Sequence, residues 1–510
     1  MSPRDGKKIC KRRKGAIFRF HLFAIVLKEK KEGEIQKSAT QMRSGLESNR
    51  RCFGVNMKKV LIANRGEIAV RVIRACHDLG LQTVAVYSQA DAQALHVLHA
   101  KEAVCIGQAS PLSSYLKIPH ILSACEMTGA DALHPGYGFL SENANFASIC
   151  ESCGLNFIGP SAKAIAMLGD KIQAKQLAKS VRCPIVPGSD GVVATLDEAL
   201  QVAKDIGFPV FIKASAGGGG KGIRIVYDQE DFARQFSAAR AEAQISFGNP
   251  DIYLEKMIMQ PRHVEIQIIG DQQGNYVYLG ERDCSIQRRR QKLIEEAPSP
   301  ILTPSLRKKM GEAAIHLVKA ADYHSVGTVE FLVDEKKNFY FMEVNTRIQV
   351  EHTVTEEITD MDLVKEQILI AQGNKLSCKQ KYVTLDGHVF QFRINAENPA
   401  KSFTPSPGLL EYYIPPGGPN VRVDSACYSG YQIPPYYDSL IAKLIIKGKN
   451  RQEAIQIAKR ALMEFHIGGI DSTIPFHLFM LDHPAFLSDN YDLGFIDDLI
   501  AKGCYFHHGD

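Results

Sequence analysis

The stretch FYFMEVNTRIQVEH, residues 339–352, places residue types that could do chemistry at a regular spacing. Its odd-numbered positions turn polar, with Glu343, Asn345, Arg347, Gln349 and Glu351, while its even-numbered positions stay mostly apolar. Side chains two residues apart lie on one face of an extended chain. The spacing therefore predicts a strand with two carboxylates, an arginine and two amides on one face and a core on the other.

A second strand, GTVEFLV, precedes this stretch and contains Glu330, and DEKKN between them has the composition of a hairpin connection. Glu330 and Glu343 would then be cross-strand neighbours. Two carboxylates beside the amide of Asn345 would repel each other unless a cation lay between them. Mg²⁺ prefers such oxygen ligands, usually with phosphates completing its shell. The alternative is a solvent-facing strand with ordinary salt bridges.

Two further residues of the stretch are of types that could bind a small acid and remove its proton. The guanidinium of Arg347 offers a fork for a small oxyanion. The carboxylate of Glu351, beside a bound acid, could take its proton. Together with the carboxylate pair, they indicate acid–base chemistry next to a metal-bound phosphate.

The segment AGGGGKG, residues 216–222, lies between two strand-like segments, FPVFIKA and GIRIV. Its glycines allow close approach of the backbone, and its N–H groups could surround phosphate oxygens. It is not a Walker A loop, because Gly222 follows Lys221 where Ser or Thr is required. We interpret it as a flap over a ligand, with a simple hairpin turn or linker as the alternative.

Cationic side chains elsewhere could bind the anionic part of a ligand. Lys213 ends the apolar strand FPVFIK, and burying an ammonium without a partner is costly. For Lys213 and Lys171 the alternative is an ordinary surface lysine. The segment QRRRQK, residues 287–292, puts four cations within six residues. These cations could form an anion-binding site, and the alternative is a solvated basic loop. A nucleic-acid patch would need interleaved aromatic residues and a basic domain, and both are missing.

The elements that must position these residues begin at Met57, where strands, glycine turns and helices alternate. This alternation predicts a parallel sheet with both faces covered. A boundary is expected near residues 160–171, followed by a smaller unit over about 184–256. The segment from Met257 to about Asn374 holds the carboxylate strands, and the remainder from Gly387 mixes strands, Pro and Gly turns and helices.

The overall totals exclude several classes of protein. A chain of 510 residues is too long to fold around a single hydrophobic core, so several domains are expected. Residues 1–56 hold fifteen of the 61 Lys and Arg and five of the 56 Asp and Glu, so the rest of the chain has a net charge of −5. This argues against a general nucleic-acid binder, and no apolar run approaches a membrane span. Cys150 and Cys153 lack a second ligand pair for zinc, which favours thiols of a reducing cytoplasm.

Residues 1–56 combine a basic cluster with a short apolar stretch, but no small-residue cleavage site follows. The acidic residues also disfavour a transit peptide. We expect a disordered extension, with a targeting or membrane-surface role as the alternative.

Several motifs, taken together and in this order, resemble one family. GDK (169–171), FIKASAGGGGKG, EKMI, RHVEIQ, ERDCSIQRRRQK, VEFL and FMEVNTRIQVEH resemble the ATP-grasp family. IANRGEIA, HPGYGFLSEN, FRINAE and YDSLIAKL narrow the resemblance to biotin carboxylase. It covers nearly all of the chain from Met57 onward. No biotin-bearing MKM motif or carboxyltransferase region is visible, so the chain resembles the separate biotin carboxylase subunit of an acetyl-CoA carboxylase.

The resemblance implies an α/β fold of three domains after the extension. These are a Rossmann-like N-terminal domain over 57–170, an ATP-grasp domain over 171–386 with a mobile glycine-rich lid at about 184–256, and a C-terminal α+β domain over 387–503. It also implies a homodimer that works in the cytoplasm with a biotin carboxyl carrier protein and carboxyltransferase subunits, without nucleic acid or membrane.

The resemblance assigns roles to individual residues. ATP would be bound by Lys171, Lys213, Gly219, Gly220, Glu255, Lys256, Met257, Ile258, His263 and Arg290. Glu330, Glu343 and Asn345 would hold one or two Mg²⁺ or Mn²⁺ ions. Bicarbonate would be bound by Lys292, Arg347, Gln349 and Val350, and Glu351 would deprotonate it. Arg393 would bind biotin, the protein-borne substrate, and stabilise its enolate.

One position departs from the family pattern. Arg290 stands where many members have histidine (RRHQK), a residue linked to ATP binding. The implied activity is ATP-dependent carboxylation of biotin through carboxyphosphate, the first half-reaction of malonyl-CoA synthesis. The alternatives are a biotin carboxylase subunit of a propionyl-CoA or pyruvate carboxylase, and a non-catalytic ATP-binding regulator.

Overall fold

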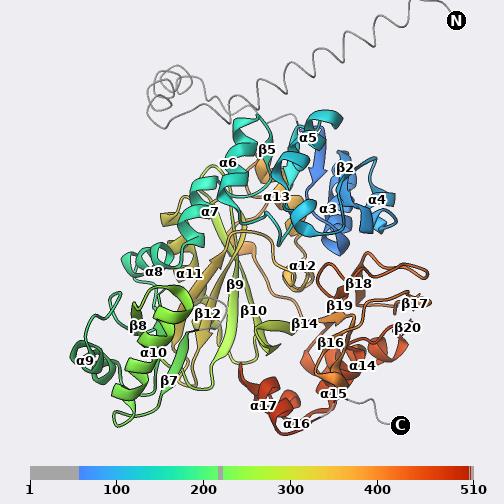
Figure 1. The fold of residues 1–510 in the computed structure, drawn as a ribbon. Helices are drawn as coiled ribbons and strands as arrows, with labels where there is room; N and C mark the ends of the chain where they lie inside the picture. Colours follow the sequence, from blue (N-terminus) through green and yellow to red (C-terminus); the bar gives the residue numbers. More distant parts are fainter. Residues whose placement is uncertain (1–56, 216–221, 505, 507–510) are drawn as a thin grey trace, which may run out of the picture. The chain divides into compact units, whose positions relative to one another are not determined.

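The computed structural model describes residues 57–215, 222–504 and 506, and three of its sheets carry the residues discussed below (Figure 1). The predicted extension over residues 1–56 and the predicted ATP ligands Gly219 and Gly220 lie outside the described residues. In the described part of the chain, no helix is both long and apolar enough to cross a membrane.

The first sheet has five parallel strands in the order β3-β2-β1-β4-β5. They are β1 (Lys59–Ile62), β2 (Gln82–Ser88), β3 (Glu102–Gly107), β4 (Ala132–His134) and β5 (Asn156–Phe157). Val60 and Ile62 pack in the core that contains helix α3 (Gly66–Asp78), whereas Leu61 packs with helices α5 (Ile118–Thr128) and α6 (Ala144–Ser152). Because both faces are covered, the strand sequence is continuously apolar. The predicted Rossmann-like parallel sheet is confirmed.

The second sheet is small and antiparallel, in the order β7-β6-β8. Its strands are β6 (Val210–Ala214), β7 (Ile223–Val226) and β8 (Ile252–Lys256). Helices α9 (Leu196–Ile206) and α10 (Phe232–Phe247) share its apolar core. Strands β6 and β7 are adjacent and antiparallel, so they flank the glycine segment as the sequence predicts.

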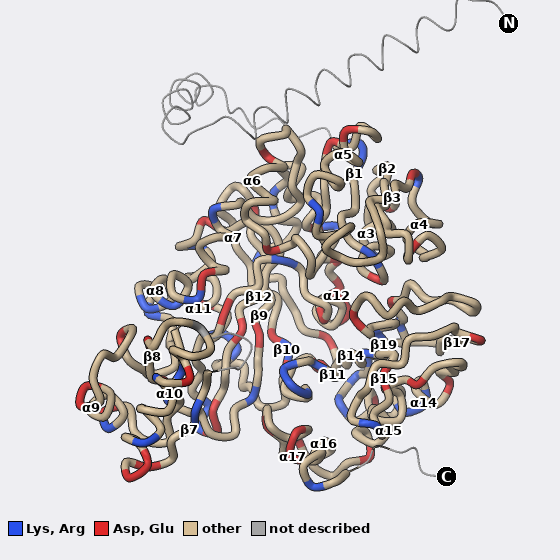
Figure 2. Tube along the Cα trace, in the orientation of Figure 1, with Lys and Arg blue, Asp and Glu red and all other residues tan. Residues whose placement is uncertain are grey.

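The third sheet has eight antiparallel strands in the order β13-β12-β9-β10-β11-β14-β19-β18. They are β9 (Arg262–Gly270), β10 (Tyr276–Arg288), β11 (Gln291–Ala297), β12 (Ser325–Val333), β13 (Phe339–Asn345), β14 (His388–Asn395), β18 (Val421–Ser425) and β19 (Leu440–Gly448). Pairing of β11 with β14 joins the region with the ATP-grasp motifs to the C-terminal region in one sheet. Figure 2 shows acidic and basic positions along its middle strands.

Helices complete the cores around this sheet. Helices α11 (Pro304–Ala320) and α8 (Lys171–Ser180) pack with strands β9 and β12, and α13 (Leu363–Ala371) packs with β12 and α3. In the C-terminal region, α14 (Arg451–Glu464) and α15 (Ile474–Asp482) cover β14 and β19 in the largest apolar cluster. A rigid apolar frame therefore surrounds the charged middle of the sheet.

The polar stretch 339–352 corrects one prediction. Its alternation predicts a strand through Glu351, but β13 ends at Asn345 and the chain then leaves the sheet. Glu351 is instead the N-cap residue of helix α12 (His352–Thr359). The side chain of Glu351 is therefore buried beside β11, whereas Glu343 on the strand is half exposed. Alternation in a sequence does not reveal where a strand stops pairing.

Candidate active site

Three neighbouring strands place carboxylates side by side at the middle of the eight-stranded sheet. Glu330 on β12 is the register partner of Glu343 on β13 and of Glu265 on β9. The predicted hairpin is present, with residues 334–338 as its connection. Directly opposed side chains lie close together. The fold therefore gathers like charges that need cations as partners.

Lys292 supplies one of those cations. Its Nζ lies 2.6 Å from Glu265 Oε2, 3.0 Å from Glu330 Oε1 and 2.6 Å from Glu351 Oε1. Burial by itself lowers the pKa of Lys292, but the three carboxylates outweigh it and hold the pKa well above its usual value. Lys292 is therefore an ammonium at neutral pH.

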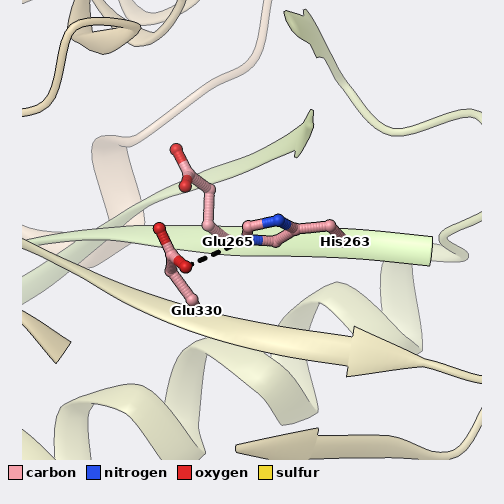
Figure 3. A group of neighbouring side chains, drawn as sticks. All are labelled: His263, Glu265 and Glu330. Carbon is pink, nitrogen blue, oxygen red and sulfur yellow. Dashed lines mark ion pairs between the residues drawn. The ribbon is translucent and has the colours of Figure 1, made fainter. Parts of the chain in front are cut away.

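Glu330 is held in its ionised form by several neighbours. His263 Nε2 lies 3.1 Å from Glu330 Oε2, and Asn345 Nδ2 donates to Glu330 Oε1 at 2.9 Å. Burial raises the pKa of Glu330, but Lys292 and His263 more than offset this, so the pKa lies below its usual value. Figure 3 shows the imidazole of His263 directed at the Glu330 carboxylate, with Glu265 alongside.

Glu343 lacks comparable compensation. Among the described residues its ion-pair partner is Lys171 on α8, whose Nζ lies 3.8 Å from Glu343 Oε2 and whose side chain is 86% exposed. Burial and the charge of Glu330 raise the pKa of Glu343. An added cation between these carboxylates would relieve that repulsion, so the donor set fits a divalent metal with a preference for oxygen ligands.

A second grouping around Glu330 also has the geometry of a metal site. Potential ligand atoms of His263, Glu265 and Glu330 all lie within 4.8 Å of one another. However, Glu265 is already paired with Lys292 and with Arg282, whose Nε donates to Glu265 Oε1 at 2.6 Å. Because these two cations neutralise Glu265, the side of Glu330 that faces Glu343 is the better place for an ion.

Glu351 lies between two cations. Its Oε1 contacts Lys292, and its Oε2 accepts from Arg393 Nη2 at 2.9 Å. Burial raises the pKa of Glu351, but Lys292 and Arg393 outweigh it and keep the pKa well below its usual value. Glu351 is therefore a buried, ionised carboxylate, which is the state that a general base requires.

Arg347 lies near the same site but is held by different residues. Its Nε donates to Glu142 Oε2 at 2.9 Å, its Nη1 to Gln349 Oε1 at 3.1 Å and its Nη2 to Asn345 Oδ1 at 3.2 Å. The backbone of Val350 is held as well, since Lys443 Nζ donates to its carbonyl at 3.1 Å. These contacts order the loop that follows β13.

Several of the predicted ATP-binding residues form a separate group on or next to the small sheet, whereas Lys171 and His263 lie beside Glu343 and Glu330. Lys213 on β6 pairs with Glu255 on β8, which also accepts from Lys175 at 2.8 Å. Lys256 donates to two backbone carbonyls, at residues 207 and 208, and the N–H of Met257 bonds to the carbonyl of residue 209. Ile258 is the second residue after the end of β8.

Arg290 stands apart from the other predicted ATP ligands. It lies in the exposed two-residue turn between β10 and β11, where both central residues have positive φ, 47° for Arg289 and 68° for Arg290. It makes no hydrogen bond or ion pair with any described residue. The structure brings together the predicted metal and bicarbonate ligands and Arg393, but leaves Arg290 exposed.

Sequence reasoning missed several charged residues that hold the site in place. They are Glu142, Glu265, Arg282, Glu295 and Lys443. Arg282 and Lys443 are fully buried, and each pairs with a buried carboxylate. Three of them lie in the motifs HPGYGFLSEN, RHVEIQ and ERDCSIQ. However, the sequence around a charged strand residue does not indicate which distant residue its side chain will pair with.

Comparison with known families agrees with the resemblance. The chain matches the biotin carboxylase N-terminal domain over residues 56–165 and the biotin carboxylase C-terminal domain over residues 391–498. Residues 170–379 match the ATP-binding domain of the carbamoyl-phosphate synthase L chain. The three matches follow one another along the chain.

Individual relatives are similar over nearly their whole length. The chain is 55% identical to "Biotin carboxylase 1" of Bacillus subtilis over 88% of this chain and 100% of that protein. It is 51% identical to a pyruvate carboxylase subunit of Methanothermobacter thermautotrophicus over 86% of this chain and 89% of that protein.

A solved structure shares the fold. It is the biotin carboxylase domain dimer of the Hydrogenobacter thermophilus 2-oxoglutarate carboxylase, in complex with MgADP, ADP and bicarbonate. The TM-score is 0.81 at 48% identity, over 89% of this chain and 99% of that one. With identity at this level across all three regions, the chain belongs to the biotin carboxylase family.

Proposed function

We propose that this chain carboxylates biotin on a carrier protein, using ATP and bicarbonate and passing through carboxyphosphate. The observation that carries the proposal is Glu351, a buried ionised carboxylate held between Lys292 at 2.6 Å and Arg393 at 2.9 Å. A protein that only bound ATP would have no use for a base between two cations. This argues against a non-catalytic regulator.

The first step is the activation of bicarbonate. Lys292, Arg347, Gln349 and the backbone of Val350 bind the anion, and Glu351 takes its proton. The pKa of Glu351 is low because of its cations, and an incoming anion that draws Lys292 and Arg393 toward itself raises the basicity of that carboxylate. The resulting dianion attacks the γ-phosphate of ATP and gives carboxyphosphate and ADP.

The nucleotide binds between the small sheet and the carboxylate strands. Lys171, Lys213, Glu255, the backbone around Met257 and Ile258, and His263 bind ATP, with Gly219, Gly220 and Arg290 as further ligands. Glu330, Glu343 and the amide oxygen of Asn345 hold one or two Mg²⁺ or Mn²⁺ ions. Such ions neutralise phosphate charge when bound. The glycine segment closes over ATP as a lid and excludes water from the intermediate.

The second step transfers the carboxyl group. The C–O bond of carboxyphosphate breaks and releases CO₂, the phosphate takes the N1 proton of biotin, and N1 then attacks the carbon of CO₂ to form carboxybiotin. Arg393 stabilises the enolate oxygen of biotin, because a fixed cation at a developing oxyanion lowers the barrier. The side chain of Arg393 is 17% exposed, which leaves it accessible to a carrier-borne substrate.

The wider assignment follows from the same chemistry and the same resemblance. We place the chain in an acetyl-CoA carboxylase as a cytoplasmic homodimer that works with a carrier protein and carboxyltransferase subunits. We divide the described chain into domains at 57–170, 171–386 and 387–503. The relatives named for pyruvate and 2-oxoglutarate carboxylases make those acceptors, and propionyl-CoA, the second candidates.

The decisive assay measures ADP formation by the purified chain with ATP and Mg²⁺, with and without bicarbonate and free biotin. We expect ATP cleavage that depends on bicarbonate and is stimulated by biotin. ATP binding without such turnover would favour the regulator. Assembly with carrier and carboxyltransferase partners, followed by an acceptor screen with several acyl-CoAs and pyruvate, separates the carboxylase classes.

A further inference from the structure

Strand β11 carries two adjacent buried glutamates that face opposite sides of the sheet. Glu295 and Glu296 are 0% and 2% exposed, and successive strand residues point to opposite faces. Glu295 contacts Arg393, whereas Glu296 contacts His388, Arg451 and Tyr491. The two residues share type, depth and strand but differ in what they hold.

Glu295 fixes the guanidinium of Arg393 from behind. Its Oε1 accepts from Arg393 Nε at 2.6 Å and lies 2.5 Å from Arg393 Nη2. Its Oε2 accepts from Gln391 Nε2 at 3.0 Å, and Gln391 in turn accepts from the hydroxyl of Thr353. Because both oxygens of Glu295 accept hydrogen bonds, its carboxylate is held in one orientation. The two donors of Arg393 that meet on Oε1 in turn fix the orientation of the guanidinium group.

Arg393 is shared between two carboxylates. The same Nη2 that contacts Glu295 also donates to Glu351 Oε2 at 2.9 Å. If the charge of Glu295 were absent, Arg393 would be free to pair fully with Glu351. Such a closed pair would withdraw Arg393 from its substrate, whereas the Oε1 of Glu351 would keep its contact with Lys292.

We propose that Glu295 is a positioning residue for carboxyl transfer: it holds Arg393 toward the biotin side and prevents its complete closure onto Glu351. This rests on the proposed function, since it assigns Glu295 to the biotin-dependent step. Glu295 touches no reacting atom and acts only through Arg393.

The surroundings of the two glutamates support a functional role for Glu295. Burial raises the pKa of Glu295, and Arg393 only partly offsets it. Burial also opposes the charge of Glu296, but His388, Arg451 and Tyr491 outweigh it and bring the pKa of Glu296 to about 2. The neighbours of Glu296 therefore more than offset its desolvation, whereas those of Glu295 do not.

The test compares Glu295→Gln with Glu296→Gln in the full chain, by two assays. One assay follows bicarbonate-dependent ATP cleavage without biotin, and the other follows carboxylation of free biotin. For Glu295→Gln we expect kcat for biotin carboxylation to fall about 30- to 100-fold, with KM for ATP and biotin-independent cleavage within about threefold. For Glu296→Gln we expect both rates within about threefold, with a lower melting temperature.

A double-mutant cycle tests whether Glu295 acts through Arg393. In an Arg393→Gln background, Glu295→Gln should reduce the residual carboxylation by less than about twofold, because residues that act as one unit are not additive. A multiplicative loss, or equal losses of biotin carboxylation from the two glutamate variants, would overturn the proposal.

Two further arms keep the result interpretable. If Glu295→Gln does not fold, Glu295→Asp is the second variant. Its side chain keeps the carboxylate but is one methylene shorter, so the carboxylate lies farther from Arg393. The same selective loss of biotin carboxylation is expected. Unchanged carboxylation in a folded Glu295→Asp would count against the proposal. If the unmodified chain shows no bicarbonate-dependent ATP cleavage, the proposed function itself fails, and the role of Glu295 falls with it.

Discussion

Two sets of buried charges lie on the two sides of strand β11. The Lys292 cluster contains Lys292, Arg393 and the carboxylates of Glu265, Glu295, Glu330 and Glu351. The Glu296 cluster contains one carboxylate, Glu296, with His388, Arg451 and Tyr491 as its partners. In the first, Lys292 and Arg393, with Arg282 on the far side of Glu265, are shared among four carboxylates. In the second, three side chains bond to one carboxylate.

The ratio of charges explains what each cluster can do. A carboxylate surrounded by donors is fixed in one state, and the pKa of Glu296, about 2, reflects this. A cation shared among several carboxylates can move toward a new anion, because the partners it leaves still contact other cations or a metal. The Glu296 cluster therefore stabilises the fold, whereas the Lys292 cluster is suited to exchange partners with substrates.

The largest expected effect comes from Glu351→Gln in the Lys292 cluster. Removing the base should lower biotin carboxylation by about 10²- to 10⁴-fold, while ATP still binds, because Glu351 contacts only Lys292 and Arg393 among the site cations. Turnover and ATP affinity by calorimetry measure the two effects. Glu312→Gln, an exposed carboxylate on α11, is the control. Unchanged turnover would remove Glu351 from the mechanism.

Glu296→Gln should affect stability rather than activity. The folded pKa of Glu296, about 2, lies below its ordinary value of 4.5, so its stabilisation is full above pH 4.5 and is lost as pH falls toward 2. The amide should remove about 3 kcal/mol of stability at neutral pH and flatten the acid dependence over that window. Chemical denaturation followed by circular dichroism at several pH values measures this. An unchanged acid dependence would contradict the assignment.

Glu343→Gln should weaken metal binding. Burial and the facing carboxylate of Glu330 raise the pKa of Glu343, which leaves a repulsion that a divalent ion would relieve. We expect Mn²⁺ affinity, measured by calorimetry in the presence of ADP, to fall about 10- to 100-fold. Glu335→Gln in the same hairpin is exposed and serves as the control. Equal affinities in the two variants would place the ion elsewhere.

Lys213→Gln should weaken ATP binding with little effect on the bicarbonate site. Lys213 is partly exposed and pairs with one carboxylate, Glu255, in contrast to the three partners of Lys292. Loss of a charge-assisted contact to phosphate predicts about a tenfold increase in KM for ATP, with KM for bicarbonate unchanged. Lys179→Gln removes an exposed lysine on the same helix as Lys175 and should leave both values unchanged.

The smallest effect is expected from Arg290→His. Arg290 lies in an exposed turn without a partner among the described residues, so restoring the common family residue should change KM for ATP by less than about threefold. Its thermal stability should match that of the unmodified chain. A large change in KM would show that Arg290 reaches the nucleotide when the substrate is bound.

Much of the fold could be predicted from the sequence alone. The apolar run KVLI and the alternation of strands with helices predict a covered parallel sheet, because period and composition are local properties. The pairing of Glu330 with Glu343 was also predictable, since only five residues separate the two strands. In contrast, the end of β13 at Asn345 was not, because the alternation continues to Glu351 while the chain leaves β12 opposite Thr328, although β12 itself extends to Ser325.

The sequence by itself determined the types of residue available for chemistry and the short-range elements that carry them. Only the tertiary structure decided which charges share a partner. Lys292 meets carboxylates that are 27, 38 and 59 residues away in the sequence, and β14 brings Arg393 to Glu295 across the sheet. The physical reason is that the ionisation of a buried group depends on every charge within a few ångströms, and strands distant in sequence supply those charges.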